Sequence, residues 1–249
     1  MTLYVGTSGW AYDEWRPDFY PPGLPYARFL EHYATSLGAC EINSTFYRRQ
    51  SEAAVKRWKS STPTSFRFTA KVHRLITHAT KMASWDERRD FMNAFMSSLS
   101  PLGRRLGAVL LQCPAHQSRA AATLERILAL VAPGTRFAIE FTHASWDDPG
   151  VRREVAGAGG TVCLSDAGGP IPEALPPGPL AYVRLRRDRY TPVEREEWRA
   201  LLARAAEERH VFAFAKHKSI PAADPFGGVG LARWLAGTRV RAGRGRLDR

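Results

Sequence analysis

Charged side chains stand inside or at the ends of four short apolar runs of this sequence. Glu41 lies in "ACEIN", Lys71 ends "FRFTAK", Glu140 lies in "RFAIEF", and Lys216 follows "VFAFA". A charge withdrawn from water in such a run is costly unless an opposite charge pairs with it. We therefore expect these acids and bases to meet at one site, where proximity would shift their pKa values and mark them as catalytic candidates.

A fifth catalytic candidate, Asp166, ends the run "TVCLSD". Glu41 and Glu140 could act as general acid and general base if their surroundings separate their pKa values. Lys71 and Lys216 could hold a phosphate or carboxylate, or stabilise an oxyanion or enolate. A desolvated lysine could instead form a Schiff base. Such a site would suit a hydrolase, a lyase or an isomerase.

The candidates for substrate binding are polar and aromatic residues that follow the same kind of apolar run. They are Ser8, Trp10, Tyr12, Asn43, Thr45, Phe46, His73, His78, Gln112, His143, Arg184 and His217. For any one of them the competing interpretation is that a strand leaving the core meets water there. The whole set is harder to explain in that way, because it accompanies charges placed in apolar segments.

Three of these residues, His73, His78 and His217, could join the acids in a metal site. However, no H-x-x-x-H or H-E-x-x-H spacing occurs at the end of an apolar run, although such spacings are typical of metal-binding helices. We therefore predict no metal ligands, and the sequence leaves any cofactor undetermined.

The stretch "GTSGWAYDEWRPDFYP" at Gly6 is rich in aromatic residues and follows the first apolar run. Trp10 and Tyr12, together with Phe46 from the next loop, could form a stacking wall for a sugar or a base. We expect Trp10 and Phe46 to line the site. Trp15 and the turn that contains Tyr20 are expected to pack beneath the loop.

Eight strand-like runs could position these residues. They begin at Leu3, Ala39, Phe66, Gly107, Arg136, Thr161, Ala181 and Val211, and most read as strands buried on both faces. Helical patterns fall between them, and the helix after Thr191 begins with a capping box in which Pro192 is the first residue and Glu194 the third. The alternation predicts parallel strands in an α/β, TIM-like (β/α)8 barrel, in which chemistry sits at the carboxyl ends of the strands.

One crossover of this barrel is expected to be irregular. The segment "GGPIPEALPPGP" between the sixth and seventh strands contains too much proline for a helix. A doubly wound open sheet is the rival fold, but no G-x-G-x-x-G follows the first strand. We predict a single barrel domain over residues 1–237 and a basic, flexible tail over residues 238–249.

Composition narrows the class of protein. The chain has 249 residues, of which 44% are hydrophobic, so a large core is possible and disorder is disfavoured. No leader pattern and no long apolar window is present, which predicts a soluble, cytoplasmic protein with no membrane partner. Cys40, Cys113 and Cys163 lack a C-x-x-C spacing and are expected to be buried free thiols.

The net charge of +12 is not confined to the tail. Such a balance favours anionic small molecules or polyanions such as nucleic acid. A genome that prefers arginine codons would produce the same bias. The charge therefore leaves both partners open.

Several segments in order resemble the YecE-like family, also called the domain of unknown function seventy-two family. They include "VGTSGWAYDEW", "CEINSTFYR", "TPTSFRFTAKV", "LGAVLLQCP", "IEFTHASW" and "YVRLR", and the resemblance runs from about Tyr4 to Trp234. It implies a TIM-like barrel without supplying a reaction. The family pattern covers Ser8, Gly9, Trp10, Tyr12, Trp15, Glu41, Asn43, Thr45, Phe46, Tyr47, Lys71, Thr77, His78, Gln112, Pro114, Glu140, Trp146, Asp166 and Arg184.

One position departs from that pattern. Thr142 stands where the resemblance implies an arginine two residues after Glu140. If that arginine clamps an anion in the family, this chain lacks the clamp or replaces it.

These observations favour an enzyme that applies acid–base chemistry to a small polar or anionic substrate, such as a sugar phosphate or a nucleotide-like molecule. The alternative is a protein that binds or processes nucleic acid, with aromatic residues stacking on an exposed base. A further alternative is a barrel that binds a ligand without catalysis. The oligomeric state is left undetermined.

Overall fold

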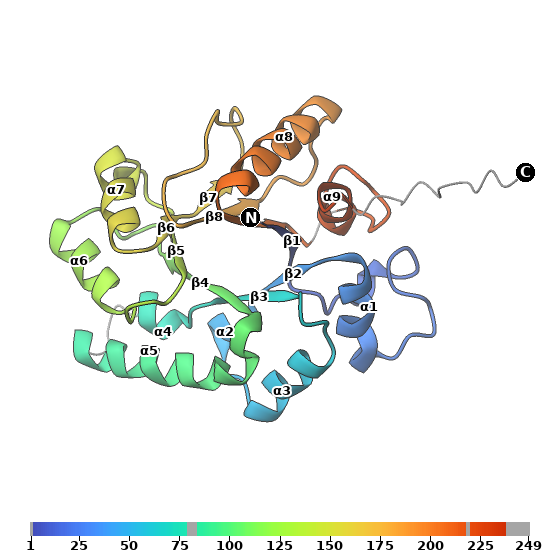
Figure 1. Ribbon diagram of the computed structural model, residues 1–249, viewed down its shortest axis with the longest axis horizontal. Helices are drawn as coiled ribbons and strands as arrows, with labels where there is room; N and C mark the ends of the chain where they lie inside the picture. The colour runs from blue at the N-terminus through green and yellow to red at the C-terminus, as the bar shows by residue number, and fades with distance from the viewer. Residues whose placement is uncertain (1, 79–83, 218–219, 238–249) are drawn as a thin grey trace, which may run out of the picture.

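The computed structural model describes residues 2–78, 84–217 and 220–237. The tail predicted over residues 238–249 lies outside them. Nine parallel strands form one sheet in the order β6-β5-β4-β3-β2-β1-β9-β8-β7, with helices around it (Figure 1). The strands are β1 Leu3–Ser8, β2 Ala39–Ile42, β3 Arg67–Lys71, β4 Leu106–Cys113, β5 Phe137–Phe141, β6 Thr161–Val162, β7 Leu164–Asp166, β8 Leu180–Leu185 and β9 His210–Ala215.

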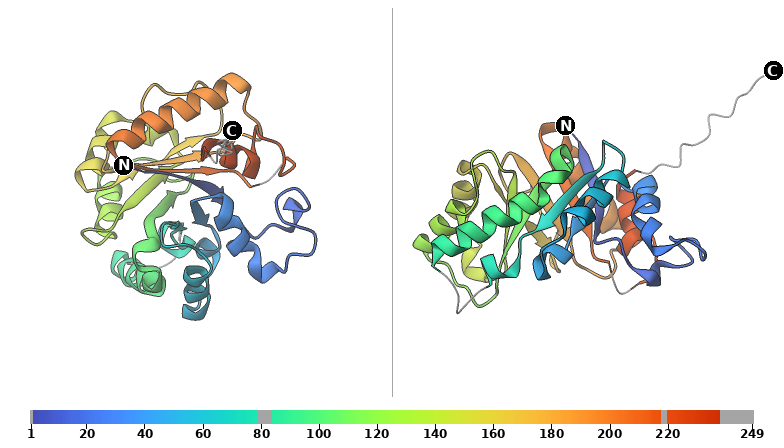
Figure 2. Two further views of the ribbon diagram at one scale, coloured as in Figure 1. Left: turned by 45° about the vertical axis from the view of Figure 1, so that its right-hand side comes forward. Right: turned by 90° about the horizontal axis from the view of Figure 1, so that it is seen from below.

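The sixth predicted strand is present as two short pieces, β6 and β7, with Cys163 between them. β6 pairs with β5, and β7 pairs with β8, while the Cys163 amide donates to the Ile139 carbonyl at 2.8 Å. Because the two ends of the sheet order are halves of one segment, the sheet curls into a nearly closed barrel (Figure 2). The predicted TIM-like barrel is confirmed, and the open doubly wound sheet is not the fold.

The helices lie around the outside of the strands (Figures 1 and 2). They are α1 Phe29–Ser36, α2 Ser44–Tyr47, α3 Glu52–Ser60, α4 Arg74–Thr77, α5 Trp85–Leu99, α6 Ala121–Ala129, α7 Pro149–Gly157, α8 Pro192–Glu208 and α9 Gly228–Leu235, with 3-10 turns η1 Asp13–Trp15, η2 Tyr26–Arg28, η3 Ser100–Arg105 and η4 Ala144–Trp146. The capping box of α8 is present, with Thr191 and Glu194 bonded reciprocally.

Helix α7 was not singled out in the sequence, although its start carries a recognisable signal. The Asp148 carboxylate accepts from the amides of Gly150 and Val151, and Pro149 is the first helical residue, where its missing N–H costs nothing. The irregular sixth crossover is confirmed. Residues 167–179 are all described, and none of them is helical.

Two apolar layers hold the barrel together. The larger lies between the sheet and the helices, and the smaller fills the barrel interior. The interior layer includes Ala108, Leu110, Tyr182, Phe212 and Phe214. Their spacing of two within each strand shows which positions face inward, because side chains alternate between the faces of a strand.

The loop after β1 is anchored by buried aromatic residues. Trp15 is 2% exposed and Tyr20 is fully buried, and their rings lie 5.9 Å apart in a stacked arrangement. Both therefore pack beneath the loop, as expected. The three cysteines are free and buried, also as expected. No helix within the described residues has the length and apolarity that a membrane crossing requires.

Candidate functional site

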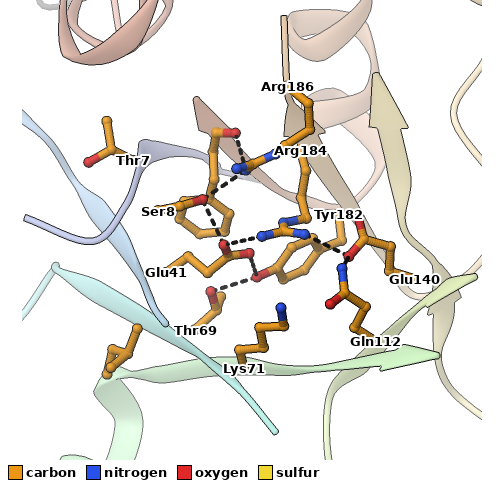
Figure 3. Close-up of polar contacts among 12 residues, drawn as sticks. Thr7, Ser8, Glu41, Thr69, Lys71, Gln112, Glu140, Tyr182, Arg184 and Arg186 are labelled. Carbon is orange, nitrogen blue, oxygen red and sulfur yellow. Dashed lines mark hydrogen bonds and ion pairs between the residues drawn. The ribbon is translucent and has the colours of Figure 1, made fainter. Parts of the chain in front are cut away.

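Inward-facing polar residues gather at the carboxyl ends of the strands (Figure 3). We call this set the mouth cluster: Ser8, Glu41, Thr69, Lys71, Gln112, Glu140, Tyr182, Arg184 and Arg186. Each of these residues lies at an inward-facing position within its strand or, for Arg186, just past the end of the strand. The alternation that fills the barrel with apolar side chains therefore also brings charged side chains together at its mouth.

Arg184 is the centre of the mouth cluster. Its guanidinium donates to Glu140 Oε2 at 2.6 Å and to Glu41 Oε1 at 3.0 Å. Gln112 Nε2 donates to the same Glu140 oxygen at 2.6 Å. Burial would lower the pKa of Arg184, but the two carboxylates outweigh burial and raise it. The expected convergence of Glu41 and Glu140 therefore occurs, with one arginine shared between them.

Glu41 is fully buried and accepts hydrogen bonds on both oxygens. Ser8 Oγ donates to Oε1 at 2.7 Å, and Tyr182 Oη donates to Oε2 at 2.8 Å. Burial would raise the pKa of this carboxyl, but Arg184, Arg186 and the two hydroxyl donors outweigh burial and lower it to about 2. Glu41 is therefore ionised at neutral pH and has no proton to donate.

Arg186 lies beside Glu41 but has a different set of partners. Its Nη2 donates to Ser8 Oγ at 2.8 Å and to the Phe214 carbonyl at 3.0 Å. Its Nε is buried without a hydrogen bond. Burial and the like charge of Arg184 lower its pKa. No carboxylate in the described part of the chain forms an ion pair with Arg186.

Lys71 projects from the end of β3 toward the cluster (Figure 3). Its Nζ lies 4.0 Å from the centre of the Phe46 ring, and among the residues that the structure describes no carboxylate forms an ion pair with it. Burial lowers its pKa, Arg184 adds to the shift, and Glu41 and Glu140 oppose it only in part, so the pKa is about 8. Lys71 can therefore gain or lose a proton near neutral pH.

Three residues of this cluster were not among the predicted site residues. Thr69 Oγ1 and Tyr182 Oη share a hydrogen bond of 2.8 Å, and Arg186 was passed over. A signal was present, because Tyr182, Arg184 and Arg186 are two residues apart and share one face of the strand run "AYVRLR". Because side chains alternate between the two faces of a strand, the placement of Arg184 at the site also predicts Tyr182 before it and Arg186 after it on the same face.

Asp166 is not brought to the mouth cluster. It pairs in register with Leu185, which belongs to the layer between sheet and helices. Paired residues of adjacent strands share a face, so the Asp166 carboxylate points outward. There it accepts from Arg187 Nε at 2.9 Å and from Trp198 Nε1 of α8 at 3.1 Å.

Lys216 is paired with a carboxylate outside the mouth cluster. Its Nζ forms an ion pair with Asp188 at 2.5 Å, and both side chains are substantially exposed. His217 is stacked on Tyr12, with ring centroids 4.2 Å apart, and its carbonyl accepts from Trp15 Nε1 at 3.2 Å. These contacts tie the end of β9 to the loop after β1.

Trp10 and Asn43 line a separate cavity outside the barrel, together with Tyr12. Phe46 instead lies at the mouth, where it contacts Lys71 and packs edge-on against His78 at 5.0 Å between centroids. The aromatic residues expected to form one wall are therefore divided between two places.

The remaining predicted residues make local contacts. Thr45 Oγ1 donates to the Ile42 and Lys71 carbonyls at 2.7 Å each. His73 Nδ1 accepts from the Leu75 amide at the start of α4, and burial lowers the pKa of this ring.

Three further positions named from the sequence, His78, His143 and Thr142, also make local contacts. His78 Nδ1 is 2.7 Å from Thr77 Oγ1, and its pKa is lowered by burial, Lys71 and His116. His143 Nδ1 accepts from the Ser145 amide and caps η4. Thr142 is exposed, and its hydroxyl donates to the Cys113 carbonyl at 2.6 Å.

Within residues 2–78, 84–217 and 220–237, no three His, Cys, Asp or Glu side chains are arranged to hold a metal ion. Of these side-chain types, the mouth cluster as defined above contains Glu41 and Glu140, and both carboxylates accept hydrogen bonds from Arg184.

Comparison with known families and proteins gives a consistent result. The family model described as a protein of unknown function, DUF72, matches residues 4–239. The UPF0759 protein YecE of Escherichia coli K12 is 31% identical over 113 residues, which cover 45% of this chain and 38% of that protein. The UPF0759 protein YunF of Bacillus subtilis is 28% identical over 115 residues, 45% of this chain and 40% of that protein. The matched part thus spans about two fifths of these curated relatives.

Solved structures extend the likeness to nearly the whole fold. A crystal structure of a DUF72 family protein from Thermotoga maritima superposes with a TM-score of 0.77 at 22% identity, covering 94% of this chain and 98% of that chain. D-psicose 3-epimerase from Clostridium cellulolyticum, solved with D-tagatose, gives a TM-score of 0.55 at 13% identity over 94% of this chain and 90% of that one. At these identities the likeness is one of fold.

Proposed function

The chain belongs to the DUF72 family of proteins of unknown function, and we propose that it is an enzyme that transfers a proton on a small anionic, hydroxylated substrate at the mouth of its barrel. The observation that carries this proposal is the surplus of cations in the mouth cluster. Glu41 and Glu140 supply two negative charges, whereas Lys71, Arg184 and Arg186 supply three positive charges, so the cluster has one positive charge in excess.

The surplus charge resides on Arg186 and Lys71, since Arg184 serves both carboxylates. A buried guanidinium that bonds only to a hydroxyl and a carbonyl gains from a phosphate or carboxylate placed beside it. Arg186 therefore supplies the anion contact in the proposed complex. Arg186 can also bind an anion through its guanidinium, which Thr142, at the position where the family resemblance implies an arginine, cannot do.

Lys71 is the proposed proton-transfer residue. A group transfers protons most effectively when its pKa lies near the working pH, and the pKa of Lys71 is about 8. Glu41, with a pKa of about 2, is assigned to holding Arg184 in place. This assignment differs from the expected acid–base pair of Glu41 and Glu140, and it omits Asp166 and Lys216, whose partners lie elsewhere.

The substrate class is proposed to be sugar phosphates, sugar acids or similar hydroxylated anions. The anionic part of this class matches the positive charges of Lys71 and Arg186, which form no ion pair within the described chain. The epimerase with a similar barrel was solved with a sugar, and this supports the class by analogy of fold alone. Proton transfer at carbon beside a carbonyl would place the reaction among isomerisations or eliminations.

Deuterium exchange tests the proposal without requiring the product to be known. The protein is incubated in D2O with a panel of sugar phosphates, sugar acids and hydroxy acids, and mass spectrometry follows deuterium at carbon. At least one compound is expected to gain deuterium. Lys71→Arg keeps the positive charge, but an arginine does not lose its proton near neutral pH. This variant should therefore bind the same compound and exchange no deuterium.

Lys216→Met is the matched control, because it removes a lysine at the same end of the barrel that pairs with Asp188. It should exchange as the unaltered protein does. Exchange that survives in Lys71→Arg would refute the assignment of Lys71. Tight binding without exchange of any compound would instead favour the non-catalytic barrel.

The net charge of +12 supports one second candidate, a protein that binds nucleic acid. Binding to a polyanion releases counterions, so the affinity must fall steeply with salt. Titration of a single-stranded oligonucleotide at about 50 mM and about 200 mM salt checks this, since several phosphate contacts lower affinity by orders of magnitude over that range. An affinity that stays level would remove this candidate.

A further inference from the structure

A second cavity lies on the outer side of β2, away from the mouth cluster. It has a volume of about 550 Å³ and is bounded by the loop after β1, by η2 and α1, and by the segment from α2 to α3. No residue of the mouth cluster lines it. Its size falls within the range of roughly 300–1,000 Å³ that is typical of small-molecule sites.

Flat aromatic surfaces form part of the cavity wall. The rings of Trp10 and Trp58 meet edge to face, with centroids 5.5 Å apart, so their relative orientation is fixed by packing. Neither indole N–H donates a hydrogen bond within the described residues. Tyr26, at 61% exposure, adds a third ring to the lining. Such faces suit the stacking of a planar ring.

The amide of Asn43 is not committed to the protein. Its oxygen is shielded from solvent without a hydrogen bond, and neither amide atom bonds to any part of the chain that the structure describes. An asparagine amide can accept from an amino group and donate to a ring nitrogen at once, which is how asparagine recognises adenine. Asn43 lines the cavity. Because no bond within the described chain holds its amide, rotation of the side chain can turn the shielded oxygen toward the edge of a bound base.

The charged side chains among the described lining residues are both positive. Arg48 and Arg57 are exposed side chains on the segment from α2 to α3, and in the described ranges neither forms an ion pair. None of the described residues that line the cavity is Asp or Glu. An anionic group bound here would meet two guanidinium groups and no opposing carboxylate.

From these contacts we propose that the outer cavity binds a mononucleotide, with its base against Trp10 and Trp58, its edge at Asn43 and its phosphate at Arg48 and Arg57. The proposal is independent of the reaction at the mouth cluster. It identifies a second site whose ligand is recognised by stacking, by an amide and by charge together.

Isothermal titration calorimetry with four probes tests this arrangement: AMP, adenosine, ribose 5-phosphate and inorganic phosphate. AMP is expected to bind most tightly. Adenosine lacks the phosphate and ribose 5-phosphate lacks the base, so each should bind about ten-fold or more weakly than AMP. Ribose 5-phosphate that binds as well as AMP would overturn the stacking assignment.

Exposed arginines allow variants that should fold. Arg57→Glu and Arg48→Glu should each weaken AMP binding by about ten-fold or more, because each replaces an attraction with a repulsion. Arg49→Glu is the matched control, since it makes the same change of charge at the next residue, which does not line the cavity. Trp58→Ala should remove the advantage of AMP over ribose 5-phosphate.

Lys71→Met separates the two sites. AMP affinity that is unchanged in this variant and lost in Arg57→Glu locates the nucleotide in the outer cavity. AMP affinity that falls in Lys71→Met and survives in Arg57→Glu would overturn the proposal in favour of the mouth cluster. Equal weakening by Arg48→Glu and Arg49→Glu, or absence of binding at millimolar AMP, would overturn it as well.

Discussion

Two networks of acids and arginines lie near the strand ends of this barrel, and they differ in which charge is in excess and in how fully their charged groups are bonded. The mouth cluster faces inward and has two carboxylates for three cations. The outer network consists of Asp166, Arg187, Glu194 and Trp198, and in it two carboxylates share one arginine, with Arg187 bonded to Glu194 at 2.7 Å. The comparison teaches that a network whose charged groups are all bonded to one another fastens α8 to the sheet, whereas a network with two cations outside any described ion pair has capacity for an anionic ligand.

The largest expected difference separates two arginines on one strand face. Arg184→Met leaves the buried carboxylates of Glu41 and Glu140 without their shared cation, which should lower the free energy of unfolding by about 3–5 kcal/mol. Arg186→Met removes a buried cation that has no ion pair in the described chain, so stability should change by less than about 1 kcal/mol.

Urea unfolding of both variants measures this contrast, and calorimetry with sulfate measures anion binding in Arg186→Met. Sulfate affinity should fall about ten-fold or more in that variant, as expected for the loss of a charged hydrogen-bonding partner. Equal destabilisation by the two substitutions would show that Arg186 is as structural as Arg184.

Low pH should lower the free energy of unfolding, because Glu41 becomes protonated. The pKa of this carboxyl is about 2 in the folded protein against an ordinary value of 4.5. The unfolded chain therefore binds more protons in this interval. The contribution of Glu41 is fully present above pH 4.5 and is lost as the pH falls toward 2. It amounts to about 3 kcal/mol.

Comparison with Glu41→Gln isolates that contribution from the other carboxyls. The difference in unfolding free energy between the unaltered protein and the variant should be large at pH 7 and should vanish near pH 2. A difference that stays constant over this range would mean that the ionisation of Glu41 is not coupled to folding.

A substitution in the outer network should lower the free energy of unfolding without changing ligand binding at the mouth cluster. Asp166→Asn removes the charge that pairs with Arg187 and keeps the side-chain shape, so we expect a loss of about 2 kcal/mol. Sulfate binding and deuterium exchange should be unchanged. Loss of exchange at full stability would instead return Asp166 to the catalytic group.

The smallest expected effect is the pH dependence of anion binding at Lys71. Sulfate keeps its charge across neutral and alkaline pH, so a change in its affinity reports on the protein. As the pH rises through about 8, Lys71 loses its positive charge and sulfate affinity should fall by several-fold. Lys71→Arg should give a level profile, and a fall of the same size in that variant would point to another group.

The barrel itself was predictable because its signals are local. Eight apolar runs alternate with helical patterns, and each observed strand begins within one residue of a predicted run, apart from the split of the sixth. That split depends on where Cys163 bonds to Ile139 rather than on composition. Helix α7 was missed although Asp148 and Pro149 mark its start.

The candidate site was predicted in part. Glu41, Lys71, Gln112, Glu140 and Arg184 do meet, because they follow inward positions at the strand ends. Asp166 was misplaced among them, since the register of β7 against β8 turns it outward, and the sequence alone does not state that register. Tyr182 and Arg186 could have been predicted as site residues, because each is two residues from Arg184 on the same strand face.

The sequence by itself determined that strands and helices alternate, that charges interrupt apolar runs, and that the chain is strongly basic. These are properties of neighbouring residues, and local periodicity reports them directly. Only the tertiary structure decided which acid meets which base, and that Trp10 and Asn43 face a cavity separate from Glu41. The reason is physical: charge pairing depends on strand register and on the face to which each side chain points, and both are settled when distant segments pack together.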